Sequence, residues 1–146
     1  MSVSREARAR THIYARVLGP WLVLVPGIIA VRANDMGALA GAFFRDPLWI
    51  WFAGALLVFG GLLIIAFHQI WSSLAAVLVS LFGWILLLRG VTLMALPNLY
   101  EQVANAVQAL WLIRAIFGVL VVAGLYLVYV GWLSKPPPVE NESLTE

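Results

Sequence analysis

The sequence contains no cysteine, so disulfide bonds, thiol redox chemistry, thiolate zinc sites and cysteine nucleophiles are all excluded. Charge is also scarce, because Asp, Glu, Lys and Arg together make up only 11 % of the 146 residues. A soluble domain of this size carries far more charge than that. Hydrophobic residues account for 63 % of the chain, and the bilayer is therefore the expected solvent for most of it.

Motifs for catalysis and cofactor binding are missing as well. The sequence has no glycine-rich phosphate loop, no nucleophile elbow and no paired buried carboxylates. His12 and His68 are the only histidines, and neither has a carboxylate at helical spacing, which excludes a Glu-x-x-His metal site. We expect no catalytic residue, cofactor, metal ion or nucleic-acid partner. The net charge of +2 lies mainly near the N-terminus and bears on membrane orientation instead.

Four apolar runs predict an all-α, polytopic membrane protein with four transmembrane helices, because each can cross a hydrocarbon core of about 30 Å. The expected spans are residues 17–33, 48–67, 73–96 and 110–133. The first run is short and contains Pro20 and Pro26, so we expect a kinked helix that borrows residues from His12 onwards. Spans two and three are joined by a short turn and should be antiparallel neighbours.

The chain divides into a basic segment at 1–16, the transmembrane domain at 17–133 and an acidic, proline-rich tail at 134–146, which we expect to be disordered. Arginines flank the first span on its N-terminal side, and positive flanks stay in the cytoplasm. With four spans, both termini should then be cytoplasmic. The segments that link spans one to two and three to four predict short interfacial amphipathic helices.

The arginines of the basic segment have two interpretations. If the segment is helical, Arg5, Arg8 and Arg16 share one narrow stripe, which suits contact with anionic lipid headgroups. The same residues are also sufficient as a plain orientation signal.

Glycines recur at intervals of seven in three of the spans, which keeps them on one face of a helix that crosses its neighbour. The seam residues are Gly54, Gly61, Gly83, Gly90, Gly124 and Gly131. Since apolar attraction does not drive helices together in lipid, close backbone contact is the expected source of association. His68 continues the seam of the second span and should face the bundle near the cytoplasmic interface, as a packing or hydrogen-bonding residue.

A gapless offset of 63 residues relates several positions of the first half to the second. The matching pairs are Trp21 and Trp84, Gly27 and Gly90, and Gly61 and Gly124. The offset predicts two duplicated two-helix hairpins, related by an axis along the membrane normal. Coincidence in an apolar composition explains so few matches equally well.

Arg89 is the only formal charge between Ser73 and Leu96. A guanidinium in hydrocarbon costs about 3 kcal/mol on insertion scales, so it must face protein, water or headgroups. It either snorkels and donates to carbonyl groups at the end of its own helix, or it belongs to a functional polar site. Glu101 is the candidate acidic partner, for which Arg114 competes at the entry of the last span.

A spaced set of histidine, aromatic, glycine and basic positions occupies the middle of the chain: His68-x-x-Trp71, Gly83-Trp84, Arg89-Gly90 and Pro97. This pattern, over about thirty residues, resembles one found in a family of small uncharacterised bacterial integral membrane proteins. The resemblance implies a four-span protein of the bacterial inner, or cytoplasmic, membrane. It implies no activity.

These features favour a non-enzymatic role, as an accessory or structural subunit of a larger membrane complex or as a self-associating scaffold. The expected partners are membrane lipids, other membrane-protein subunits or copies of the chain itself. The alternative is a small oligomeric transporter or channel that uses Arg89, supported by the Pro26-Gly27 break and the possible duplication. An enzyme acting on lipids has the least support.

Overall fold

A computed structural model of the chain describes residues 2–106 and 110–134, and the side chains of 7–102 and 110–134. This part is almost entirely helical and contains no strand. In chain order the elements are α1 (Ser2–Val31), the short 3₁₀ turn η1 (Ala33–Asp35), α2 (Met36–Arg45), α3 (Pro47–Phe67), α4 (Leu74–Ala95), α5 (Pro97–Ala106), α6 (Leu110–Val128) and the π-helical η2 (Tyr129–Leu133).

Four helices are long and apolar enough to cross a membrane, which confirms the predicted all-α, four-span fold class. The spanning segments are Ala7–Val31, Pro47–Phe67, Leu74–Ala95 and Leu110–Leu133. The protein is therefore a multi-pass membrane protein.

The first span differs from the predicted division of the chain. Helix α1 begins at Ser2 and continues through Pro20 and Pro26, so residues 2–16 of the predicted basic segment belong to the same helix as the first span. A neighbouring helix that packs along its length supports α1 where the prolines remove hydrogen bonds. Of the predicted disordered tail at 134–146, only Ser134 is among the described residues.

Local capping residues set where the second and third spans begin. The Asp46 carboxylate accepts a hydrogen bond from the Leu48 amide at 2.9 Å, and Pro47 occupies the first helical position of α3. The Ser73 hydroxyl accepts from the Ala76 amide at 3.2 Å and so begins α4. At the end of α4, Pro97 starts α5 and turns the chain across the bundle.

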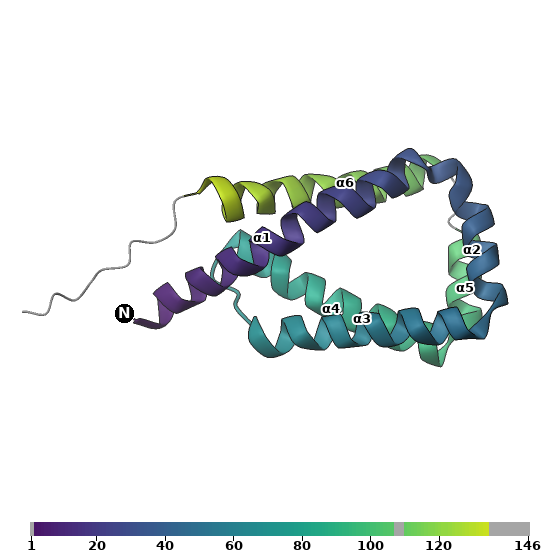
Figure 1. Cartoon of the computed structure of the whole chain (residues 1–146), viewed down its shortest axis with the longest axis horizontal. Helices are drawn as coiled ribbons and strands as arrows, with labels where there is room; N and C mark the ends of the chain where they lie inside the picture. Colours follow the sequence, from purple (N-terminus) through teal and green to yellow (C-terminus); the bar gives the residue numbers. More distant parts are fainter. Residues whose placement is uncertain (1, 107–109, 135–146) are drawn as a thin grey trace, which may run out of the picture.

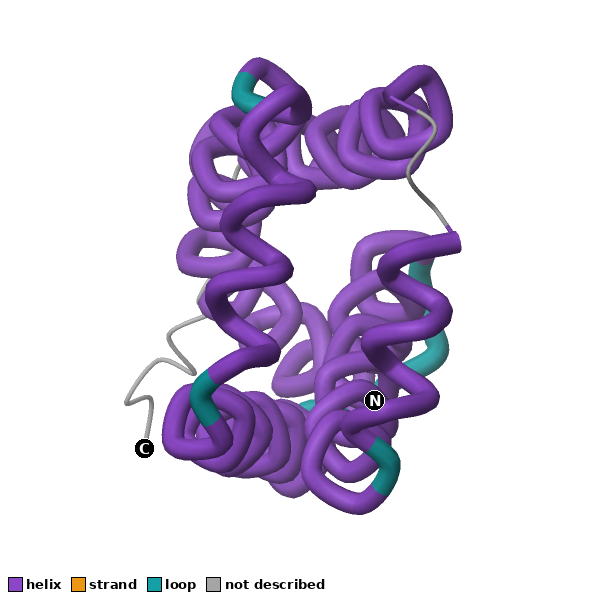
Figure 2. The backbone as a smooth tube through the Cα atoms, turned by 90° about the vertical axis from the view of Figure 1, so that its right-hand side faces the viewer, coloured by secondary structure: helices purple, strands orange, loops and turns teal. Residues whose placement is uncertain are grey.

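The long helices form two antiparallel pairs, α1 with α6 and α3 with α4 (Figures 1 and 2). The predicted antiparallel contact between spans two and three is thereby confirmed. At one end, which we call the His68 end, the start of α1 crosses near α4, beside the 68–73 loop and η2 (Figure 1). At the other end, the α2/α5 end, these two short helices touch and run across between the pairs.

Glycine allows the backbones of α3 and α4 to touch. A methyl group on Gly61 would lie 2.6 Å from the Leu87 amide nitrogen and 2.8 Å from the Gly83 carbonyl oxygen. One on Gly90 would lie 2.7 Å from the Val58 amide nitrogen. No side chain fits into these positions, so the helices approach more closely than leucine-faced helices can.

The α1/α6 pair is built in the same way. A methyl group added to Gly124 would lie 2.8 Å from the Leu22 Cβ, and one added to Gly131 would lie 2.7 Å from the Arg16 amide nitrogen. Gly19 makes an equivalent contact from α1, 2.7 Å from the amide nitrogen of Val128, and it lay outside the predicted seam. The six seam glycines all lie at one of the two pair interfaces, where Gly54 faces Met94 and Gly83 faces Ile64.

The 63-residue offset relates one pair of helix ends. The end of α1 at Val31 shifts to residue 94, within one residue of the end of α4 at Ala95. Contacts repeat as well. A methyl group added to Gly27 would lie 3.8 Å from Val121 Cγ2, and one added to Gly90 would lie 2.8 Å from Val58 Cγ2. The two glycines are 63 residues apart, and so are the two valines. At these positions the halves α1–α3 and α4–α6 correspond.

The predicted hairpins are nevertheless exchanged between the halves. Each span makes its most extensive contact with a span of the other half, α1 with α6 and α4 with α3. The reason is the length of the connecting helices. Helices α2 and α5 have 10 residues each, about 15 Å, whereas packed helices lie about 8–10 Å apart. The two spans of one half therefore make much less contact with each other than with the other half.

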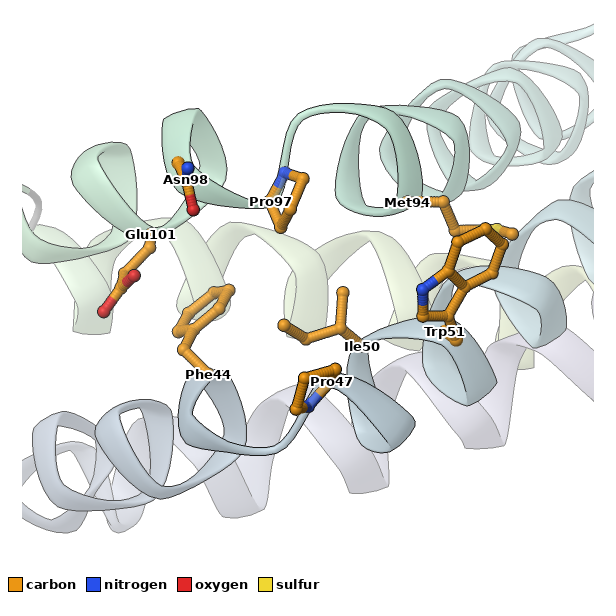
Figure 3. A pocket seen from close by; sticks show the side chains of 8 residues that line it. All are labelled: Phe44, Pro47, Ile50, Trp51, Met94, Pro97, Asn98 and Glu101. Atoms are coloured by element: carbon orange, nitrogen blue, oxygen red, sulfur yellow. The ribbon is translucent and has the colours of Figure 1, made fainter.

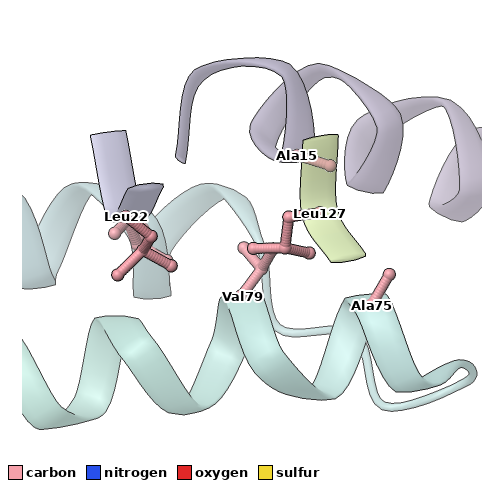
Figure 4. Close-up of a cluster of buried hydrophobic side chains, with 6 residues drawn as sticks. Ala15, Leu22, Ala75, Val79 and Leu127 are labelled. Atoms are coloured by element: carbon pink, nitrogen blue, oxygen red, sulfur yellow. The ribbon is translucent and has the colours of Figure 1, made fainter. Parts of the chain in front are cut away.

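A small hydrophobic cluster joins the two pairs at the His68 end (Figure 4). Its members come from α1, α3, α4 and α6 and are Ala15, Leu22, Ile64, Ala75, Val79 and Leu127. Val79 and Leu127 are almost completely buried and lie side by side in Figure 4. Trp21 of α1 packs edge-on against Phe82 of α4, with ring centroids 5.6 Å apart.

Two adjacent glycines provide a matched test of the α3/α4 contact. Gly61→Ala should lower the free energy of unfolding by about 1–3 kcal/mol, because its methyl group meets backbone atoms that cannot move away. Gly60→Ala should leave stability unchanged or slightly higher, since its methyl group would lie 3.9 Å from Leu86 Cδ1. Thermal unfolding in detergent, followed by circular dichroism, measures both. Equal effects of the two variants would contradict this interface.

Candidate functional site

A buried polar cluster lies at the His68 end. His68 follows the last residue of α3 directly and is completely buried. Its Nε2 atom is 3.0 Å from the Thr11 hydroxyl of α1, and its Nδ1 atom is 3.2 Å from the Ser80 hydroxyl of α4. One imidazole thus connects three spanning helices, two of one pair and one of the other.

The partners of Thr11 indicate which ring nitrogen holds the proton. The Thr11 hydroxyl donates to the Ala7 carbonyl at 2.9 Å, so it is left to accept from His68 Nε2–H. His68 Nδ1 faces the Ser80 hydroxyl, whose single proton has three acceptors within reach, this nitrogen and the carbonyl oxygens of His68 and Ile70. Both ring nitrogens therefore lie within hydrogen-bonding distance of a hydroxyl group.

Ser80 also organises the loop between α3 and α4. Its hydroxyl accepts from the Ile70 amide at 3.3 Å and lies 3.1 Å from the His68 carbonyl and 3.0 Å from the Ile70 carbonyl. The Tyr14 ring meets the imidazole edge-on, with centroids 5.2 Å apart. Burial lowers the pKa of the His68 imidazole below its ordinary value. Burial in the cluster therefore favours the neutral ring.

Arg16 joins the middle of α1 to η2. Its Nε atom donates to the Gly131 carbonyl at 2.9 Å, and its guanidinium lies 5.4 Å from the Trp132 ring centroid. The Trp132 indole donates back to the Arg16 carbonyl at 3.2 Å. Of the predicted headgroup contacts, Arg16 thus holds helices together while remaining exposed, and Arg8 is exposed. The side chain of Arg5 is outside the described ones.

Arg89 does not bind the carboxylate proposed for it. Its guanidinium lies over the Tyr100 ring of α5, 5.7 Å from the centroid, in a cation–π contact. Within residues 7–102 and 110–134 the one ion pair joins Arg32 to Asp35, so neither Arg89 nor Arg114 is paired with Glu101 there. Both arginines are exposed. The bend at the end of α4 brings Tyr100, the residue before Glu101, under the Arg89 guanidinium.

Glu101 lines a cavity of about 210 Å³ at the α2/α5 end (Figure 3). The cavity lies where the start of α3 and the end of α4 meet the two short helices. Its lining residues are Phe44, Pro47, Ile50, Trp51, Met94, Pro97, Asn98 and Glu101. Asn98 and Glu101 bring polar groups to one end, while Trp51 and Met94 lie at the other (Figure 3).

Thr11 and Ser80 were not among the predicted site residues. Ser80 has one local signal, because it is the only hydroxyl side chain between Ser73 and Thr92 in an otherwise apolar helix. Thr11 has none, since its partner His68 lies 57 positions later. In the described part of the chain, no group of His, Cys, Asp and Glu residues could hold a metal ion.

No protein-family model, curated protein or solved structure matches this chain. The resemblance to small bacterial membrane proteins therefore stays a prediction. Functional conclusions depend on the residues and contacts described above.

Two serines near the 68–73 loop test the polar cluster. Ser80→Ala removes the hydroxyl that contacts the imidazole and the Ile70 amide, and should lower the free energy of unfolding by about 1–3 kcal/mol. Ser72→Ala changes an exposed side chain and should change the free energy of unfolding by less than about 0.5 kcal/mol. Thermal unfolding in detergent compares them. A Ser80 variant as stable as the Ser72 variant would show that the cluster contributes nothing.

The lowered pKa of His68 predicts the direction of pH dependence. Above the ordinary pKa of about 6.5, neutral His68 contributes its full stability. As the pH falls below that value the unfolded chain takes up a proton that the folded site resists, so stability is lost, by at most about 1.4 kcal/mol per pH unit. The thermal midpoint should therefore fall on acidification in the wild type and in His12→Gln. It should fall much less in His68→Gln, and an unchanged slope there would refute the assignment.

Proposed function

We propose that this protein is a non-enzymatic, multi-pass protein of the bacterial inner membrane. Its proposed role is that of an accessory or structural subunit of a larger membrane complex, or of a self-associating scaffold. The observation that supports it best is that the buried histidine, His68, is occupied by contacts within the chain. His68 is fully engaged by Thr11 and Ser80, within a cluster that holds three helices together.

The outward surface of the bundle supports a role in assembly. Each spanning helix buries only between 17 % and 33 % of its apolar window inside the chain. Most of each helix therefore faces lipid or another protein. Since helix association in membranes depends on packing and not on apolar attraction, these surfaces are available to other subunits or copies without loss of the internal pairs.

The proposed orientation places the His68 end in the cytoplasm. Arg8, Arg10 and Arg16 all lie in the first part of α1 at this end. At the opposite end Arg32 is neutralised by Asp35, with their side chains 3.0 Å apart. The positive-inside rule then favours both chain ends on the cytoplasmic side.

The alternative function, a small oligomeric transporter or channel, has one supporting observation. Arg89 lies two turns after Phe82, on the face of α4 that meets Trp21 of the other pair. An exposed guanidinium inside a spanning helix is expensive in lipid, which favours a polar surrounding for it. Four thin spans leave little internal room, so such a pathway would form between copies.

Native mass spectrometry of the intact protein, isolated in mild detergent from its own membrane, tests the proposal. We expect an assembly heavier than the 16.0 kDa chain, with a reproducible stoichiometry of copies or of a second subunit. Arg89→Leu should leave that stoichiometry unchanged, because the guanidinium contacts the Tyr100 ring of its own chain.

The same preparations, reconstituted into liposomes, decide between the two candidate functions. Ion and solute flux should equal that of protein-free liposomes for the wild type. A monomer of 16.0 kDa without partners contradicts the assembly role. Flux that is present in the wild type and absent in Arg89→Leu would favour the transporter instead.

A further inference from the structure

We propose that the cavity at the α2/α5 end is a binding site for the headgroup of a phospholipid that carries a primary ammonium group, with the Glu101 carboxylate as the acceptor. This site goes beyond the role proposed above and does not depend on it. It requires only that the chain crosses a membrane.

The cavity straddles the level at which the spans end. Two of its walls belong to spanning segments, since Trp51 lies in Pro47–Phe67 and Met94 in Leu74–Ala95. Its other end is formed by Asn98 and Glu101 of α5, which lies outside the spans. The cavity is therefore apolar toward the membrane core and polar toward the headgroup region (Figure 3). A phospholipid in a bilayer has the same orientation, with its acyl chains toward the membrane core and its headgroup toward water.

Glu101 is available to bind a cation. Its carboxylate has no ion pair or hydrogen bond within residues 7–102 and 110–134, and its side chain is only partly exposed. Asn98 lies three residues earlier on the same side of α5, so its amide oxygen can accept a second hydrogen bond.

The size and walls of the cavity select the ligand. At about 210 Å³ it is smaller than the 300–1,000 Å³ of sites that enclose whole small molecules, so it suits a headgroup whose chains remain outside. Phe44 lies beside Glu101 and offers an aromatic face to a cation (Figure 3). Ile50 lies between the polar and apolar ends, next to the less polar part of the lipid.

Hydrogen bonding distinguishes between headgroups. A primary ammonium donates up to three hydrogen bonds, which Glu101 and Asn98 can accept. A trimethylammonium group has the same charge but no donor, and a glycerol headgroup leaves the lipid with a net negative charge that the carboxylate repels. The expected order of affinity is phosphatidylethanolamine, then phosphatidylcholine, then phosphatidylglycerol.

Native mass spectrometry of the delipidated full-length protein in detergent measures this order. The three lipids are added with identical short acyl chains, and the fraction of protein with one bound lipid is followed with concentration. We expect phosphatidylethanolamine to bind about tenfold more tightly than phosphatidylglycerol. Glu101→Gln, which keeps the shape of the side chain, should abolish that preference. Ile50→Phe, which fills the cavity but keeps the carboxylate, should weaken binding of phosphatidylethanolamine.

Asp35→Asn is the matched control, because it removes a carboxylate at the same end of the molecule that does not line the cavity. It should bind all three lipids like the wild type. Equal binding of the three lipids by the wild type, or an undiminished preference in Glu101→Gln, would overturn the proposal. The wild-type comparison decides the matter even if a variant does not fold. The bound lipid is counted on single chains, so a failed assembly test leaves this result unaffected.

Discussion

Lipid tails are as apolar as leucine, so helices in a bilayer gain little by burying leucine against leucine. They must associate through contacts that lipid cannot imitate. In this chain those contacts are made where glycine brings one backbone onto another. Gly61 and Gly90 do so between α3 and α4, and Gly124 of α6 and Gly131 of η2 do so against α1. Since each pair is held along its length in this way, the remaining side chains are free to face outward or to serve other purposes.

The short crossing helices decide how the two pairs are connected. Because α2 and α5 separate the ends of the spans within each half, each half makes most of its helix contacts with the other, and the two halves become mutually dependent. This exchange also makes the ends of the molecule different. The His68 end is closed by the hydrophobic cluster and the polar cluster, whereas the α2/α5 end contains the cavity lined by Glu101.

The repeated scaffold holds chemistry that is not repeated. Shifted by 63 residues, Thr11 falls on Leu74, Ser80 on Val17, and Glu101 on Ala38. Two glycine pairs keep the correspondence, Gly27 with Gly90 and Gly61 with Gly124, because all four lie at helix contacts. The polar residues Thr11 and Ser80 have no counterpart in the other half, because the chain has one imidazole at the crossing of α1 and α4 and it needs one set of partners. The two candidate sites thus lie at opposite ends, one structural and one open to a ligand.

Hydropathy and length are local properties, and for that reason the four spans, their approximate boundaries and the glycine seams follow from residue order alone. The same holds for the direction of His68, since it continues a seam at heptad spacing. Partners distant in the chain do not follow in this way. Thr11 reaches His68 across 57 residues, and Arg89 meets Tyr100 instead of Glu101 because the bend before α5 sets which side chain turns back. The exchange of spans and the cavity exist only once two rigid crossing helices are placed in space, because distances between helices are not encoded in any local pattern.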